Sequence, residues 1–184
     1  MSGERIANMN DAISAALATT KSVVATLDHS MFDDIDVSAI RFSDTANWHT
    51  VLSKLNDQFA WNDLNKPQGI TNLGQAYSML DKWLTSNAAD GTIHTLIVVL
   101  VTDGMPTDEP SISPHWLKNN AIADRFERIA FALGSDAESS YLDEFVSNED
   151  NLYILTNESM LKELLSRALT KAIRKTPGNK QRQH

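Results

Sequence analysis

The sequence predicts an α/β fold of the Rossmann-like, doubly wound kind, in which a mostly parallel sheet carries helices on both faces. Two observations lead to this fold class. Segments with helical periodicity alternate along the chain with segments of strand periodicity. Residues 95–101 are apolar on both faces, which is typical of a central strand covered by helices on each side. At 184 residues the chain is long enough for one domain, which we place at residues 1–175.

The first elements are a helix and a strand pair. Apolar residues spaced by three or four, from Ile6 to Leu27, form one stripe along a helix. Residues 35–42 and 47–52 have strand character, and the short polar turn between them predicts a hairpin with one exposed edge.

A second helix is expected over residues 73–84, where apolar residues again recur at helical spacing. Asn72 and Gln75 offer a capping box for its start. After the strand at 95–101 and a proline-rich loop, the remaining elements are expected as a helix at 116–126, a strand at 128–133, a short helix at 142–146, a strand at 152–155 and a helix at 158–175. Residues 176–184 are expected to form a polar, basic tail.

The charge distribution excludes some classes of partner. The chain has 16 basic and 24 acidic residues, a net charge of −8. Residues 162–184 contain seven basic residues and one acidic residue, so the rest of the chain is strongly acidic. An acidic body repels phosphate backbones, so we expect no nucleic-acid binding. No run of 18 apolar residues occurs, so we expect no membrane span.

The common enzyme signatures are absent from the sequence. The seven glycines form neither a dinucleotide-binding fingerprint nor a P-loop, and no nucleophile elbow is present. The five histidines include no pair at metal-ligand spacing, and there is no cysteine. We therefore predict no catalytic residue and no enzymatic activity.

Two segments place hydroxyl and carboxylate groups where ligands bind to sheets of this class, beyond the carboxyl ends of strands. Residues 102–108 (TDGMPTD) follow the apolar strand, and residues 69–74 (GITNLG) precede a helix. Such oxygen groups would suit Mg²⁺. The plainer interpretations are that Thr71 caps its helix and that Asp103 with Gly104 only turns the chain.

Together, and in this order, these segments resemble the von Willebrand factor A (vWA) domain, and most closely its bacterial, tellurium-resistance-associated TerY-like group. Residues 69–74 resemble the family's threonine loop and residues 100–108 its aspartate loop. Further similarity lies at residues 2–6, 39–43 and 129–134. The resemblance implies a metal-ion-dependent adhesion site (MIDAS), with Thr71 and Asp103 as ligands of Mg²⁺, and a cytoplasmic bacterial protein.

The resemblance also implies that part of this site is missing. The family's Asp-x-Ser-x-Ser triplet ends its first strand, and this sequence begins where that motif would finish. The missing strand would lie in the centre of the sheet, between the strands ending at Phe42 and Val101. Three outcomes are open: the chain is an incomplete domain, a partner donates the strand, or the two neighbouring strands pair directly.

We therefore expect a non-enzymatic protein-interaction module whose partner presents an Asp or Glu side chain to the metal once the site is complete. Asp108 would orient a metal-bound water from the second shell of the ion. One alternative is a metal-free scaffold that binds through its surface, with the four tryptophans as candidate anchors. Another is a metal-dependent hydrolase or phosphoryl-transfer enzyme that uses Asp103 and Asp108.

Overall fold

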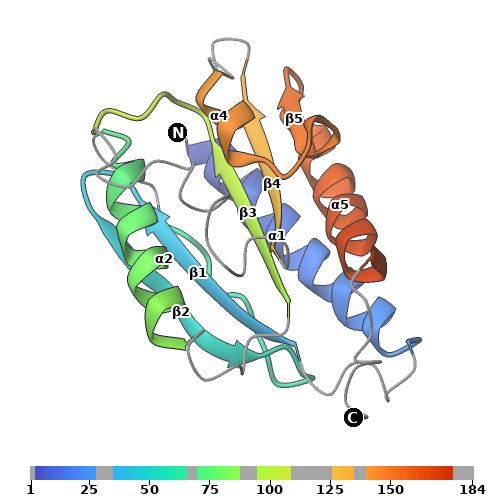
Figure 1. Ribbon diagram of the computed structural model, residues 1–184. Coiled ribbons are helices and arrows are strands. Elements are labelled where there is room, and N and C mark those ends of the chain that lie inside the picture. Colours follow the sequence, from blue (N-terminus) through green and yellow to red (C-terminus); the bar gives the residue numbers. More distant parts are fainter. Residues whose placement is uncertain are drawn as a thin grey trace.

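The computed structural model describes residues 3–27, 35–65, 70–87, 95–108, 126–134 and 140–175. The α/β class predicted from the sequence is confirmed (Figure 1). In chain order the elements are α1 (Gly3–Val24), β1 (Asp36–Phe42), β2 (Ala46–Lys54), α2 (Leu73–Asn87), β3 (Leu96–Thr102), β4 (Phe126–Leu133), α4 (Ser140–Phe145), η2 (Glu149–Asn151), β5 (Leu152–Leu155), η3 (Glu158–Met160) and α5 (Leu161–Lys175).

The strands form two separate sheets. Strands β3, β4 and β5 make a parallel sheet in that order, and β1 and β2 make the predicted antiparallel hairpin. Figure 1 shows β1 on the side of the hairpin that is toward β3. Among the residues that the structure describes, no ladder joins β1 to β3, so the third of the three outcomes, direct pairing of these strands, is not found there. The missing central strand would lie at this place, and it stays a prediction.

This arrangement corrects the position of β3, which we expected to be central. In the described part of the chain β3 pairs only with β4 and is therefore the edge of its sheet. Its aliphatic side chains are accordingly mostly half-buried, and only Leu100 and Thr102 are buried. The central and most buried strand is β4.

The core is built on both faces of β4, because successive side chains of a strand point to opposite sides. Ile129, Phe131 and Leu133 pack with α1 and α5. Phe126, Ala130 and Ala132 pack with α2 and α4 on the other face. Helices thus cover both faces of the parallel sheet, as a doubly wound fold requires (Figure 1).

Several details differ from the sequence-based expectation. Phe126 begins β4 and does not end a helix, since it pairs with Leu96. The buried stripe of α1 runs through Ala12 and Ala16, because small side chains suit its close packing against α5. The first turn of the last helix is the 3₁₀ turn η3. Gly69, the loop at 109–114, the helix expected at 116–125 and the tail at 176–184 lie outside the described residues.

The start of α2 is capped from a distance. The amide groups of Gly74 and Gln75 each donate to the carboxylate of Asp108, at 3.0 Å. The expected capping box is therefore wrong, because the Asn72 side chain donates to the carbonyl of Asp44 and the Gln75 side chain accepts from the amide of Ala46.

None of the helices within the described ranges is long and apolar enough to span a bilayer.

The cap makes Asp108→Ala informative. Two amide groups at the positive end of α2 would lose their acceptor, so we expect the free energy of unfolding to fall by about 1 kcal/mol. Chemical denaturation measures this change. Asp63→Ala, at an exposed acidic residue, is the matched control and is expected to shift stability by less than about 0.5 kcal/mol. Equal effects of the two substitutions would contradict the capping role.

Two tyrosines whose hydroxyl groups differ in their hydrogen bonding give a second prediction. The hydroxyl of Tyr77 is buried with no hydrogen-bond partner among the described residues, and burial raises the pKa of Tyr77. Tyr77→Phe removes an unsatisfied polar group, so we expect unfolding to cost about 1 kcal/mol more. Tyr141→Phe removes a hydrogen bond to the carbonyl of Gly104 and is expected to cost about 1 kcal/mol of stability. Denaturant midpoints of both variants test this difference in sign, and a destabilised Tyr77→Phe would refute it.

Candidate functional site

The two loops singled out in the sequence meet in the structure. The amide of Thr71 donates to the hydroxyl of Thr107 at 3.0 Å, and the amide of Thr107 donates to the carbonyl of Thr71 at 2.9 Å. The Thr71 hydroxyl also faces Gly104, where an added Cβ would lie 3.3 Å from it. The structure thus brings Thr71 beside the aspartate loop, against Gly104, the residue that follows Asp103.

Hydroxyl groups from the end of β3 and from α4 hold the aspartate loop in place. The hydroxyl of Thr102, which is buried, donates to the carbonyl of Gly104 at 3.0 Å. The Tyr141 hydroxyl donates to the same carbonyl at 2.8 Å. Burial, together with the charge of Asp103, raises the pKa of Tyr141, so its hydroxyl stays a donor. These bonds fix the backbone that carries Asp103.

The Asp103 carboxylate forms an ion pair that the sequence did not reveal. Arg5, in the first turn of α1, places Nη1 3.2 Å from Oδ2 of Asp103. The same guanidinium donates through Nε to the carboxylate of Glu158 in η3. The hydrogen bond to Asp103, with the nearby charges of both carboxylates, raises the pKa of Arg5. Asp103 is therefore more than a turn residue, because it anchors α1 to the end of β3.

The sequence held only a weak signal for this cluster. Glu158 follows the strand at residues 152–155 closely, so the convergence of parallel strand ends placed it near Asp103. Nothing in the residues around Arg5 indicated that the first turn of a helix would reach the same place. The third residue proposed for the site, Asp108, lies at the other end of the aspartate loop, where it caps α2.

The residues present do not fit a tightly bound metal ion. Thr71 and Asp103 would supply two of the six oxygen ligands of octahedral Mg²⁺, so water or other groups would have to supply four. One oxygen of Asp103 already lies against Arg5. Within the described ranges, no group of three or more histidine, cysteine or acidic residues could hold an ion.

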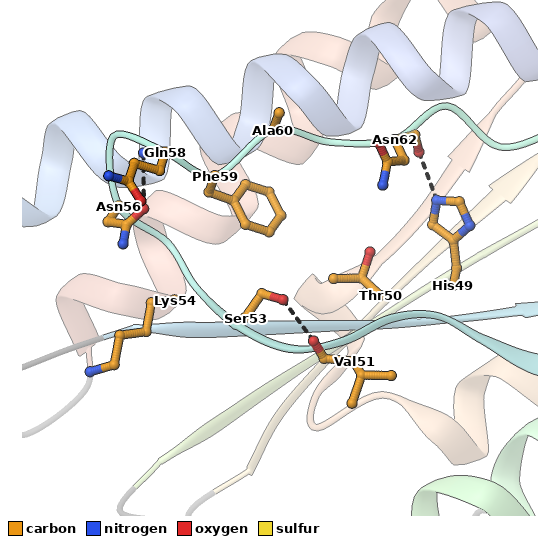
Figure 2. A pocket seen from close by; sticks show the side chains of 10 residues that line it. All are labelled: His49, Thr50, Val51, Ser53, Lys54, Asn56, Gln58, Phe59, Ala60 and Asn62. Carbon is orange, nitrogen blue, oxygen red and sulfur yellow. Dashed lines mark hydrogen bonds between the residues drawn. The ribbon is translucent and has the colours of Figure 1, made fainter.

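A separate polar pocket lies beside β2 (Figure 2). It has a volume of about 440 Å³ and is formed by the second half of β2 and the segment that follows it. Figure 2 shows His49 on one wall, where its Nε2 lies 2.6 Å from the carbonyl oxygen of Asn62. Because Lys54 in this wall pairs with Asp36 at the start of β1, the pocket lies away from the loops that carry Thr71 and Asp103. It contains no acidic side chain and adds nothing to the site.

Comparison with solved structures supports the fold. Proximal thread matrix protein 1 from the mussel byssus superposes with a TM-score of 0.62 at 17% sequence identity, covering 91% of this chain and 42% of that chain. A form of that protein with a zinc-occupied MIDAS motif gives 0.57 at 16% identity, covering 86% of this chain and 40% of that one. The ArnB paralog VWA2 from Sulfolobus acidocaldarius superposes with a TM-score of 0.55 at 19% sequence identity, covering 84% of this chain and 39% of that chain.

These identities show a shared fold alone, and this chain spans about two fifths of the length of each of these proteins. A search of curated proteins gives no match. The sequence model of the von Willebrand factor type A domain, however, matches residues 7–167, which is most of the chain. With the parallel sheet, the helices on both of its faces and the paired threonine and aspartate loops, this match shows that the chain belongs to the von Willebrand factor type A domain family.

Proposed function

We propose that this chain binds a protein partner through the face formed by the threonine loop, the aspartate loop and the start of α1. Domains of the family are protein-interaction modules. The observation that carries the proposal is the reciprocal pair of hydrogen bonds between Thr71 and Thr107, which joins the loop before α2 and the loop after β3 into one surface. Such a surface is preformed, so a partner would not need to order it on binding.

Apolar side chains on both loops support a protein partner. Ile70, directly before Thr71, is 55% exposed, and Met105, directly after Gly104, is 47% exposed. Met105 belongs to the same loop as Asp103, which pairs with Arg5, and Ile70 adjoins Thr71, which is bonded to that loop. Apolar anchors around a few polar groups are typical of protein-interaction surfaces.

The metal-dependent form of this function stays a prediction. Binding of Mg²⁺, and of an Asp or Glu side chain from the partner, needs more ligands than Thr71 and Asp103. The assignment to the TerY-like group and the cytoplasmic location also stay predictions. The described geometry supports the metal-free alternative better, because the docking surface is already held together by hydrogen bonds and an ion pair.

The enzyme alternative has little support from the described residues. Its two carboxylates are both engaged, Asp103 with Arg5 and Asp108 with the amide groups at the start of α2. A turnover screen of generic phosphoesters with Mg²⁺ or Mn²⁺ tests it directly.

The docking face can be tested with peptide ligands selected from a random display library on the intact chain. We expect the double substitution Ile70→Ser and Met105→Ser to weaken the selected ligands about tenfold or more, as loss of an interface anchor does. The matched control is Val51→Ser with Leu52→Ser on β2, which are also exposed apolar residues but lie beside the polar pocket. Titration calorimetry gives the affinities. Loss of binding in the control and not in the loop variant would place the docking surface on β2 and refute the proposal.

A partner that donates a strand is a second proposal, and it is supported by the sheet edges. Both β1 and β3 pair on one side only in the described part of the chain, and such edges accept an added strand. With such a ligand bound, amide hydrogen exchange in residues 36–42 and 96–102 should slow by about tenfold or more. Protection confined to the loop amides would show that the ligand docks without adding a strand.

A further inference from the structure

The guanidinium of Arg5 lies at the carboxyl ends of all three parallel strands. It pairs with Asp103, directly after β3, and with Glu158, three residues after β5. It also lies against Gly134, directly after β4, where an added Cβ would be 3.8 Å from Nη2. This edge of a parallel sheet is where proteins of the class bind their ligands. In this chain a side chain occupies the place of a ligand.

The packing of α1 fixes this position. Ile6 and Met9, which follow Arg5 on the helix, are buried in the core together with Leu133 and Leu155. The first turn of α1 is therefore held against the ends of β4 and β5. Gly134 has a φ of +104°, a conformation that suits glycine, and its amide donates to the carbonyl of Leu155 at 2.9 Å.

The cluster of Arg5, Asp103 and Glu158 has one positive and two negative side chains. Asp103 and Glu158 are only 19% and 20% exposed, and Arg5 is 36% exposed. With Arg5 present the three side chains carry a net charge of −1. Without it, two partly buried carboxylates would lose the cation that they share, and the hydroxyl of Thr71 lies against Gly104, the residue after Asp103. Carboxylate and hydroxyl oxygens are the groups that hard divalent cations prefer.

We propose that Arg5 is the resident cation of this strand-end site and that it excludes divalent cations from Asp103. A guanidinium suits this role, because its planar fork donates to two carboxylates at once and keeps its charge at all physiological pH values. Arg5 and a divalent cation then compete for the same carboxylate oxygens, and the chain with Arg5 in place has the metal-free form of the site. The inference concerns the same face as the proposed docking function, but it needs no partner and is tested on the chain alone.

The test is a titration with Mn²⁺ of the wild-type chain and of Arg5→Gln. We expect Arg5→Gln to bind Mn²⁺ at least about tenfold more tightly, because one nearby positive charge has been removed. Arg5→Lys keeps the charge and is expected to bind as weakly as the wild type. The double variant Arg5→Gln with Asp103→Asn should lose the gained affinity, which assigns it to this cluster. Calorimetry gives the dissociation constants, and thermal melts with and without Mn²⁺ report whether the ion restores stability to Arg5→Gln.

Two results would overturn the proposal. Arg5→Gln that folds and binds Mn²⁺ no more tightly than the wild type would show that Arg5 is only a structural link between α1, β3 and η3. If Arg5→Gln does not fold, the wild type decides, since selective broadening of the Asp103 and Thr71 amide resonances by one equivalent of Mn²⁺ would show that Arg5 does not exclude the ion. Neither measurement depends on a peptide ligand, so failure of the docking proposal would leave this one standing, and the reverse also holds.

Discussion

The parallel register of β3, β4 and β5 is the constraint on which the candidate site depends. In this register Thr102 is paired with Ala132, and Leu133 is paired with Leu155, so the three strands end at one edge of the sheet. The residues that follow them, Asp103, Gly134 and Glu158, are for this reason neighbours in space although they are far apart in the sequence. A shift of register in either ladder would separate the two carboxylates that Arg5 joins.

A second constraint connects this edge to the hairpin and to α2. Asp108 caps α2 from the far end of the aspartate loop, so the loop is fixed at Tyr141 on one side and at the helix on the other. Asn72 connects the same region to the turn after β1 through its amide and its side chain. Thr71 lies between these two attachments, which explains how a short loop keeps its hydroxyl against Gly104. The site is rigid because each of its loops is bonded to an element other than its own.

The sequence predicted most of the helices and strands, because the spacing of apolar residues indicates which side chains are buried. These side chains are buried against the faces of the sheet, and the same packing determines the fold. The strand at 152–155 has the expected limits. Thr71 was expected near the loop that carries Asp103, and it lies against Gly104 of that loop. The failures at the candidate site share one cause, which is that groups far away in the chain compete with local ones. Asn72 and Gln75 match a capping box locally, but Asp108 takes their place in a way that no local pattern can show. The pairing of Arg5 with Asp103 likewise depends on how α1 packs on the sheet.

The cluster also constrains the chemistry of a partner. If Arg5 excludes divalent ions as proposed, an acidic side chain from a partner meets the net charge of −1 of the three side chains, so charge contributes little to its binding. The energy of docking must then come from apolar contacts such as those offered by Ile70 and Met105. If Arg5 were displaced, the same loops would present two carboxylates and a hydroxyl, and a divalent ion would attract the acidic group that the resident arginine does not. Under these proposals, the position of the Arg5 side chain therefore decides whether a partner would dock through apolar contacts or through a bound metal ion.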